Sequence, residues 1–281
     1  MLLELGTVEY GPALELQREL VELRLRDGIP DTLVLLEHPP VITLGRNAGR
    51  SNLLASDAEL ARRGVKLFRA ERGGDITFHG PGQLVGYPVF KLGAGGREEG
   101  PGNRGQGAGL VGVRSFVDRV QAALVQALAE LGVRSGMRPG YVGVWVGGEV
   151  RGDKDEGRSR KDEVPSPQSP VPGPHSPTPG PGLPRKIASI GVAVRRGVTF
   201  HGFALNVTTD LSWFDLMHPC GLAQVRMTSV RTEGGRAGAA AARAAVTGGF
   251  EQAFGLRFQR NLPRSLTSLT NGLSRSAIPS A

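Results

Sequence analysis

One run rich in glycine and proline, set between two apolar segments, constrains this chain more than any other feature. Residues 72–88 contain five glycines and two prolines around a single histidine, His79. Glycine lets the backbone turn through positive φ and approach a ligand closely, and successive N–H groups in such a loop can bind an anion or a carbonyl oxygen. An ordinary hairpin turn has a similar composition. The order of the residues therefore has to decide between a turn and a binding loop.

The length and composition indicate a globular protein of one large domain or two small ones. The chain has 281 residues, of which 39% are hydrophobic and 21% charged, enough for a substantial core. Its single cysteine excludes a disulfide within the chain and fits a reducing compartment. No membrane-length apolar stretch is present, and no basic residue precedes Arg18, which argues against a signal or transit peptide. A cytoplasmic enzyme of bacterial type is the simplest interpretation.

The formal net charge of +8 raises the question of nucleic-acid binding. Residues 231–281 hold seven Arg and two Glu, a net charge of +5, so most of the excess lies near the C-terminus. The aromatic residues are not interleaved with the basic ones, as a binding face for single strands requires. A mildly basic surface suits an acidic protein partner equally well.

The periodicity of apolar residues predicts an α+β fold, with one mixed sheet flanked by helices. Helices are expected at 12–26, 116–131 and 237–254, with a short one after the capping box of Ser56 and Glu59. Strands are expected at 32–37, 41–44, 65–71, 84–90, 141–146, 187–194 and 198–207. The domain is expected to span 1–260, interrupted by a glycine-rich loop at 93–109 and a disordered Pro-rich insertion at 151–184, with a flexible tail at 261–281.

The lone cysteine stands in the sequence His218-Pro219-Cys220-Gly221. A single cysteine is most often a buried small hydrophobe. Here the flanking proline and glycine predict a turn instead. A turn can expose the sulfur and aim the N–H groups of Gly221 and Leu222 at a developing oxyanion.

A nucleophilic cysteine needs a group that lowers its pKa, because a free thiol is only a few per cent thiolate at neutral pH. Lys186, which opens the segment Lys-Ile-Ala-Ser-Ile-Gly, is the candidate. An ammonium close to the sulfur favours the thiolate and can return a proton to a leaving group. Taken alone, Lys186 is more simply explained as a solvated residue at a strand edge.

In combination, these segments resemble the lipoyl(octanoyl) transferase family, whose members are octanoyl-acyl carrier protein:protein N-octanoyltransferases. The resemblance rests on residues 72–88, 185–191 and 201–206 and on Pro219-Cys220-Gly221, and it covers about 3–92 and 111–230. It implies the fold of the catalytic domain of biotin and lipoate protein ligases. It also implies that the 1–260 unit is an octanoyltransferase catalytic domain.

The resemblance implies a reaction in lipoate biosynthesis that attaches an octanoyl group to a lysine through a cysteine thioester. The donor is octanoyl-acyl carrier protein, and the acceptors are lipoyl domains of 2-oxoacid dehydrogenases and the glycine cleavage H protein. No cofactor is implied, because thioester exchange is nearly isoenergetic and the final amide lies downhill. A metal site is not expected either, since His79, His201, His218 and Cys220 lack the spacing of zinc ligands.

The resemblance assigns roles to individual residues. Cys220 is the nucleophile, Lys186 its proton-transfer partner, and His79 a third catalytic residue that polarises the acyl carbonyl or helps to move a proton. A histidine that merely holds its glycine turn through hydrogen bonds is an equal alternative for His79. The residues implied to bind substrate are Arg72, Gly73, Gly74, Asp75, Ile76, Thr77, Phe78, His79, Ser189, Ile190, Gly191, Gly202, Phe203 and Ala204.

Three other functions stay open at this point. One is an ATP-dependent lipoate or biotin ligase on the same fold, and another is a non-catalytic module that binds acyl carrier or lipoyl domains. The third is nucleic-acid binding through the basic C-terminal region. The insertion at 151–184 ends one residue before Arg185, so it either disturbs the strand that carries Lys186 or loops out from it.

Overall fold

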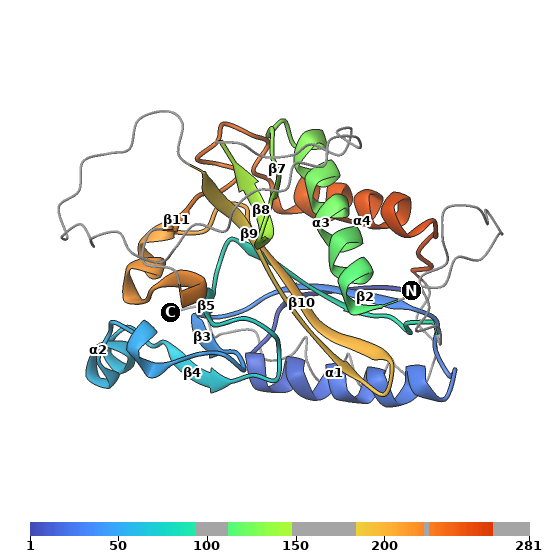
Figure 1. Cartoon of the computed structure of the whole chain (residues 1–281), viewed down its shortest axis with the longest axis horizontal. Coiled ribbons are helices and arrows are strands. Elements are labelled where there is room, and N and C mark those ends of the chain that lie inside the picture. Colours follow the sequence, from blue (N-terminus) through green and yellow to red (C-terminus); the bar gives the residue numbers. More distant parts are fainter. Residues whose placement is uncertain (94–111, 148–183, 222–224, 261–281) are drawn as a thin grey trace.

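The computed structural model describes residues 1–93, 112–147, 184–221 and 225–260 of the chain (Figure 1). Its strands are β1 (Leu2–Thr7), β2 (Thr32–Glu37), β3 (Val41–Leu44), β4 (Lys66–Arg69), β5 (Ile76–His79), β6 (Gln83–Val89), β7 (Gly136–Arg138), β8 (Tyr141–Val146), β9 (Arg185–Arg195), β10 (Val198–Asn206) and β11 (Arg226–Met227). Its α-helices are α1 (Tyr10–Leu25), α2 (Asp57–Arg62), α3 (Val113–Glu130) and α4 (Ala239–Phe254). Short 3₁₀ helices lie at η1 (Arg50–Asn52), η2 (Leu211–Leu216) and η3 (Pro219–Gly221).

Two sheets organise the fold. The larger is eight-stranded and mixed, with the order β1-β2-β6-β10-β9-β8-β7 and with β11 paired to β9. The smaller is three-stranded, with the order β4-β3-β5. The predicted fold, a mixed sheet flanked by helices, is therefore confirmed, and the second sheet is an addition to it.

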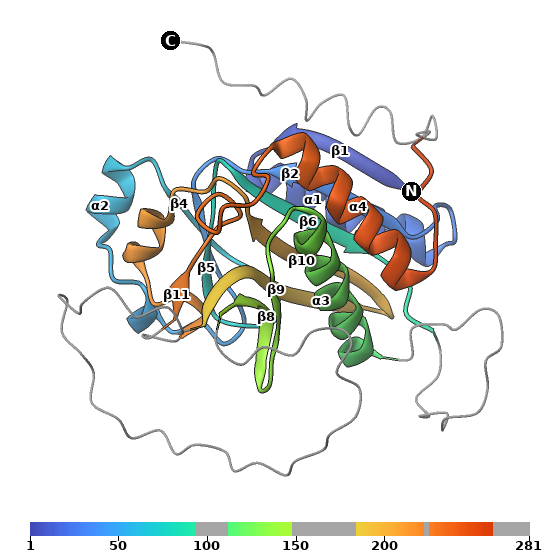
Figure 2. The ribbon, with the colours of Figure 1, turned by 90° about the horizontal axis from the view of Figure 1, so that it is seen from above.

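Helices cover both faces of the large sheet (Figures 1 and 2). Helices α3 and α4 pack on one face, where Phe116 and Phe250 are fully buried. Helix α1 packs on the other face through Leu16 and Leu20. Removing these large apolar side chains from water is the main favourable contribution to folding.

Strand β2 shows why a continuous apolar run forms a central strand. Successive side chains of a strand point to opposite faces. Leu33 and Leu35 therefore enter the core beneath α3 and α4, while Val34 and Leu36 enter the core beneath α1. Because both faces are covered, the alternation of apolar and polar residues seen in half-exposed strands is absent from this run.

Most of the predicted elements are confirmed. Strands β2, β3 and β8 have the predicted bounds. The observed bounds of α1, α3 and α4 differ from their predicted bounds by a few residues at most. Helix α2 begins as its capping box predicts, since Ser56 Oγ accepts a hydrogen bond from the backbone N of Glu59 at 3.2 Å. Strands β8 and β9, which lie on the two sides of the insertion in the sequence, are antiparallel neighbours.

Residues 72–83 were expected to be a loop between strands at 65–71 and 84–90, and in this respect the prediction is wrong. The run contains β5, which pairs antiparallel with β3 and joins Ile42 to Phe78 in register. Ile76 and Phe78 are fully buried in the core of the small sheet, so burial holds this segment extended despite the glycines around it. The backbone adopts positive φ at Gly74 and Gly82, on the two sides of the strand.

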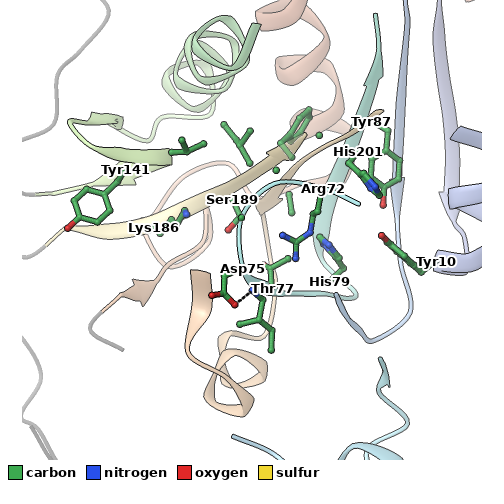
Figure 3. A pocket seen from close by; sticks show the side chains of 18 of the residues that line it. Tyr10, Arg72, Asp75, Thr77, His79, Tyr87, Tyr141, Lys186, Ser189 and His201 are labelled. Atoms are coloured by element: carbon green, nitrogen blue, oxygen red, sulfur yellow. Dashed lines mark hydrogen bonds between the residues drawn. The ribbon is translucent and has the colours of Figure 1, made fainter. Parts of the chain in front are cut away.

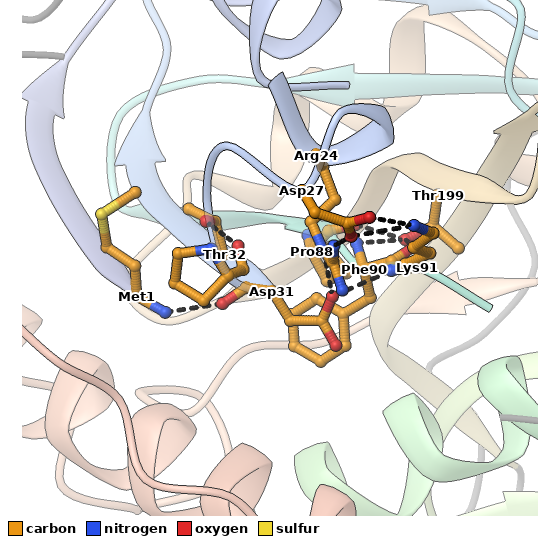
Figure 4. Close-up of polar contacts among 10 residues, drawn as sticks. Met1, Arg24, Asp27, Asp31, Thr32, Pro88, Phe90, Lys91 and Thr199 are labelled. Atoms are coloured by element: carbon orange, nitrogen blue, oxygen red, sulfur yellow. Dashed lines mark hydrogen bonds and ion pairs between the residues drawn. The ribbon is translucent and has the colours of Figure 1, made fainter. Parts of the chain in front are cut away.

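Polar contacts hold the segments at one end of the large sheet together (Figure 4). The Asp31 carboxylate accepts from Arg24 Nε at 2.7 Å and from the backbone N of Lys91 at 2.9 Å. The buried Thr199 hydroxyl accepts from the backbone N of Phe90 at 3.0 Å. The Thr199 bond is buried, and the Arg24–Asp31 pair is partly buried, with the side chains 16% and 29% exposed.

The predicted loop at 93–109, insertion at 151–184 and tail at 261–281 lie outside the described residues, except for Gly93 and Pro184. The assignment of 1–260 to one catalytic domain stays a proposal. In the part of the chain that the structure describes, no helix combines the length and apolar character needed to cross a membrane.

Candidate active site

A cavity of about 200 Å³ lies between elements of the two sheets (Figure 3). Strands β9 and β10 form one side of the cavity through Lys186 and residues 189–191 and 202–204. We call this side the large-sheet wall. We call the opposite side, formed by residues 72–79 as they lead into and along β5, the small-sheet wall. The walls are joined by a hydrogen bond of 2.9 Å from the backbone N of Gly73 to the O of Val192.

The structure brings most of the predicted site residues together. Those that line the cavity are Arg72, Gly74, Asp75, Ile76, Thr77, His79, Lys186, Ser189, Ile190, Gly191, Gly202, Phe203 and Ala204. Phe78 does not line it, because the alternation of β5 points this side chain into the core of the small sheet, where it stacks on Trp213. Gly73 contributes its backbone bond between the walls rather than a lining surface.

Several lining residues were not predicted from the sequence. They are Tyr10, Tyr87, Gly140, Tyr141, Val142 and His201. Figure 3 shows Tyr10, Tyr87 and His201 on the side of the cavity opposite Tyr141. His201 stands directly before a predicted substrate segment, so its position in the sequence is a usable signal. Tyr10 has no such signal, because α1 reaches the cavity only through the packing of the fold.

Lys186 projects from β9 and is only 4% exposed. Its side chain passes over Gly143, whose φ is +130°, so that a Cβ added there would lie 2.5 Å from Lys186 Cε. Gly143 is held in place by its backbone N, which donates to Gln121 Oε1 of α3 at 3.0 Å. Lys186 Nζ lies 5.3 Å from the centre of the Trp145 ring, within the range of a cation–π contact. Two residues of β8, one of them held by α3, therefore define the path of the lysine.

Cys220 lies in η3, as the predicted turn requires, while its side chain is outside the described part of the structure. Gly221 adopts a positive φ of +70° and approaches the small-sheet wall so closely that a Cβ there would lie 2.5 Å from Asp75 Oδ2. Asn52 Nδ2 donates to the same Asp75 oxygen at 2.8 Å. The turn of the cysteine therefore packs against a residue that lines the cavity.

The proton of His79 can be placed from the hydrogen bonds around it. Gln83 Nε2 donates to Phe78 O at 3.1 Å and to Asn206 Oδ1 at 2.9 Å, so Gln83 Oε1 is left as an acceptor. His79 Nδ1, at 2.8 Å from this oxygen, therefore carries the proton. Burial, followed by the charges of neighbouring groups, lowers the pKa of His79 well below 6.5. His79 is thus a neutral imidazole.

Arg72 and Thr43 extend this chain of hydrogen bonds. Arg72 Nε and Nη2 donate to Thr43 Oγ1 at 3.2 and 2.8 Å, and Nη2 also donates to Thr43 O at 2.7 Å. Because the Thr43 oxygen accepts twice, its own proton points to the remaining neighbour, His79 Nε2, at 3.5 Å. Both nitrogens of His79 therefore face groups of the protein itself.

A second buried pair lies next to these residues. His38 Nδ1 lies 2.6 Å from the carbonyl oxygen of Val8, which can only accept, so this nitrogen carries the proton. His38 Nε2 in turn accepts from the Tyr87 hydroxyl at 2.7 Å. Burial lowers the pKa of His38 to about 4 and raises the pKa of Tyr87 well above 10. Both side chains are therefore uncharged near neutral pH.

The fold is that of lipoate protein ligase catalytic domains. An archaeal bipartite lipoate protein ligase from Thermoplasma acidophilum superimposes with a TM-score of 0.61 over 98% of this chain and 91% of its own, at 17% identity. A lipoate-protein ligase A crystallised with ATP gives a TM-score of 0.60 over 98% of this chain and 94% of its own, also at 17% identity. At such identities the likeness establishes the architecture alone.

Sequence comparison gives a closer relationship. The model of the lipoyl protein ligase A/B catalytic domain matches residues 9–251. An octanoyltransferase of Acidobacterium capsulatum is 44% identical over 83% of this chain and 79% of its own length. One from Koribacter versatilis is 43% identical over 83% of this chain and 75% of its own. The chain therefore belongs to the lipoyl protein ligase A/B catalytic domain family and, within it, to the octanoyltransferases, which are acyltransferases of protein lipoylation.

The family predicted from the sequence is thereby confirmed, together with the class of enzyme. Among the residues that the structure describes, no three His, Cys, Asp or Glu side chains are grouped so that they could hold a metal ion.

Proposed function

We propose that this chain transfers an octanoyl group from octanoyl-acyl carrier protein to a lysine of a lipoyl domain, through a thioester on Cys220. The observation that carries the proposal is the buried Lys186, which borders the same cavity as Asp75, the residue against which the turn of Cys220 packs. A cavity with a lysine, beside a turn that carries a cysteine, suits acyl transfer through a covalent intermediate.

In the first half-reaction the Cys220 thiolate attacks the carbonyl carbon of the carrier thioester. A new C–S bond to Cys220 forms and the C–S bond to the carrier breaks. The carrier leaves as a thiol after taking a proton from the Lys186 ammonium. One thioester replaces another, so no nucleotide is needed to drive the exchange.

In the second half-reaction the neutral amine of the lipoyl-domain lysine attacks the Cys220 thioester. The C–N bond of the amide forms, the C–S bond breaks, and the thiolate of Cys220 is regenerated. The attacking nitrogen gives its extra proton to the now neutral amine of Lys186, which restores the starting ammonium. The two half-reactions use alternate substrates, so ping-pong kinetics are expected.

For His79 we favour a positioning role. Its Nδ1 donates to Gln83, and its Nε2 faces the Thr43 hydroxyl, so hydrogen bonds within the protein already occupy it. These bonds support the alternative in which the histidine holds the glycine-rich segment against the cavity. Arg72 and His79 would then fix the small-sheet wall, and Cys220 and Lys186 would carry out the bond changes.

The proposed partners are an acyl carrier protein as donor and, as acceptors, the lipoyl domains of 2-oxoacid dehydrogenases and the glycine cleavage H protein. The basic balance of the chain, +8 at neutral pH, would favour encounter with acidic domains. A cysteine that has to stay reduced to act as a nucleophile fits a cytoplasmic reaction.

Intact-protein mass spectrometry after mixing with octanoyl-acyl carrier protein, without ATP, tests the proposal. We expect a gain of one octanoyl group that is absent in Cys220→Ala and is discharged by a lipoyl domain. The matched control is His218→Gln, which alters the same turn two residues away and should still form the adduct. Activity that requires ATP and free fatty acid and survives Cys220→Ala would instead identify a ligase.

Lys186→Arg tests the proton transfer separately. Arginine keeps the positive charge but does not give up a proton. We expect acylation to fall by about a hundredfold, within the range that positioned proton transfer contributes. Full activity of Lys186→Arg would show that Lys186 acts by charge alone.

A further inference from the structure

The end of the cavity away from Lys186 is polar. At the mouth, Tyr141 and Val142 are 39% and 52% exposed, whereas Tyr10 and His201 are each only 2% exposed. Figure 3 shows Tyr10, Tyr87 and His201 gathered on the side of the cavity opposite Tyr141, with the two hydroxyl groups and the imidazole turned toward the same space. We call this region, bounded by Tyr10, Tyr87 and His201, the inner end.

Two polar atoms at the inner end have no hydrogen-bond partner among the described residues. They are Tyr10 Oη and His201 Nε2, both fully enclosed, and Ser189 Oγ is a third such atom farther along the same cavity. Buried donors and acceptors in proteins are normally paired, because leaving one unmade costs its full desolvation. Orphaned atoms that face one cavity therefore point to a ligand with a polar group.

The backbone of His201 supports the same conclusion. His201 lies inside β10 yet has a φ of +55°, a conformation that residues other than glycine seldom adopt. Its backbone N donates to Gln17 Oε1 at 2.8 Å, and Gln17 Nε2 donates to Ala13 O at 3.2 Å within α1. Strained backbone of this kind is typical of ligand sites. The fold therefore holds this imidazole at the cavity against a local preference.

Both orphaned groups are uncharged. Burial raises the pKa of Tyr10 to about 12, so its O–H stays a donor. Burial, followed by the charge of Arg72, lowers the pKa of His201 to about 3, so its ring is neutral. A hydroxyl group both donates and accepts, so it can pair with Tyr10 and with either tautomer of His201. A carboxylate can only accept, and its charge would have to be buried.

We propose that the inner end is a subsite for a hydroxyl group at the tail of the acyl chain, so that the enzyme accepts ω-hydroxylated medium-chain acyl groups as well as octanoyl. The direction of the chain, with its carbonyl at Lys186 and its tail at Tyr10 and His201, rests on the proposed function. The subsite itself rests on the orphaned atoms and on the strained position of His201.

Calorimetric titration with octanoate and with 8-hydroxyoctanoate tests the subsite without any acyl transfer. The quantity compared is the ratio of the affinity for 8-hydroxyoctanoate to the affinity for octanoate. We expect this ratio to be roughly fivefold higher in the wild-type protein than in Tyr10→Phe, which corresponds to one hydrogen bond. Tyr10→Phe keeps the ring that packs against His38 and Phe68. The matched control, Tyr141→Phe, removes a hydroxyl at the mouth and should leave the ratio of the two affinities at the wild-type value.

A second variant, His201→Asn, keeps a residue type that tolerates left-handed backbone and shortens the side chain. It should lower the same ratio, and a thermal melt shows whether it is folded. An unchanged ratio in Tyr10→Phe, or no binding of either acid to the wild-type protein, overturns the subsite. Failure of the cysteine to become acylated, with the affinity ratio as expected, would overturn only the proposed function.

Discussion

The two walls of the cavity are built in opposite ways. The large-sheet wall carries Lys186 and depends on close backbone packing, since at Gly191 and Gly202 an added Cβ would lie 2.8 Å and 2.2 Å from backbone oxygens of Gly73 and Gly86. The small-sheet wall uses polar side chains, and it joins Arg72 to neighbouring groups through a chain of hydrogen bonds. One wall combines close backbone packing with a buried lysine, and the other combines polar side chains with a chain of hydrogen bonds.

The difference shows how one cavity meets two requirements. The strands and the neighbouring backbone have to pack closely, which glycine allows because it has no side chain. The polar groups need fixed protonation states, which buried hydrogen bonds enforce. Each wall should therefore fail in its own way when it is altered, and the following changes test this separation, beginning with the largest expected effect.

Gly143→Ala should damage catalysis most, because the new Cβ would meet Lys186 Cε at 2.5 Å and Ala188 O at 2.7 Å. A displacement of the lysine by about 1 Å is enough to lower the rate roughly a hundredfold. The measurement is the rate of acyl transfer, with the fold checked by circular dichroism.

The matched control is Gly132→Ala, which has a φ of +83° and no atom within 4 Å of the added Cβ. It should lose about 1 kcal/mol of stability through backbone strain and keep its transfer rate. Equal loss of rate in both variants would show that Gly143 of β8 does not position Lys186.

Thr43→Val should mainly destabilise the small-sheet wall. Valine has nearly the shape of threonine, but it removes the oxygen that accepts from Arg72 and the proton that faces His79. We expect a loss of about 2 kcal/mol in the free energy of unfolding, because buried donors lose their partner.

Urea denaturation measures this change, with Thr247→Val as the matched control. The Thr247 hydroxyl bonds the carbonyl of Arg243 within α4, so its loss should cost less than about 1 kcal/mol. If the two variants lose the same free energy of unfolding, the hydrogen bonds of Thr43 stabilise the protein no more than an ordinary hydrogen bond within a helix.

The pH dependence of stability is the most gradual effect. The pKa of His38 is about 4 in the folded chain against an ordinary 6.5, so between these values the unfolded chain binds a proton that the folded chain does not. Stability should therefore fall as the pH falls through this window, by up to about 1.4 kcal/mol per pH unit for each such histidine. His201, with a pKa of about 3, adds to the loss in the same direction.

Urea titrations at several pH values measure this slope in the wild type and in His38→Gln. In His38→Gln the slope should fall by up to about 1.4 kcal/mol per pH unit, the contribution of one proton. An unchanged slope in His38→Gln would mean that His38 is already charged in the folded state.

Parts of the site follow from the sequence and others do not. Glycine at positions 73, 74 and 191 and the order of the residues around Lys186 and Cys220 predict a binding segment and two reactive groups. The sequence does not show that Phe78 turns away from the cavity, because the burial of β5 decides which face each side chain takes. Nor does it show that the Tyr10 hydroxyl lacks a hydrogen-bond partner among the described residues, since this depends on all the groups that surround it in the fold.

The sequence by itself determined two kinds of property: local structure, and membership of a family that several short segments indicate together. Strand β2 and the cap at Ser56 can be predicted because a short window of residues contains the physical cause, either unbroken apolar character or a hydroxyl before a helix. The family could be recognised because several short segments act together. Only the tertiary structure decided that α1 carries Tyr10 to the cavity, that Gly143 makes room for Lys186, and that His38 is held neutral. Those properties depend on contacts between residues far apart in the chain, and a short window of sequence does not encode them.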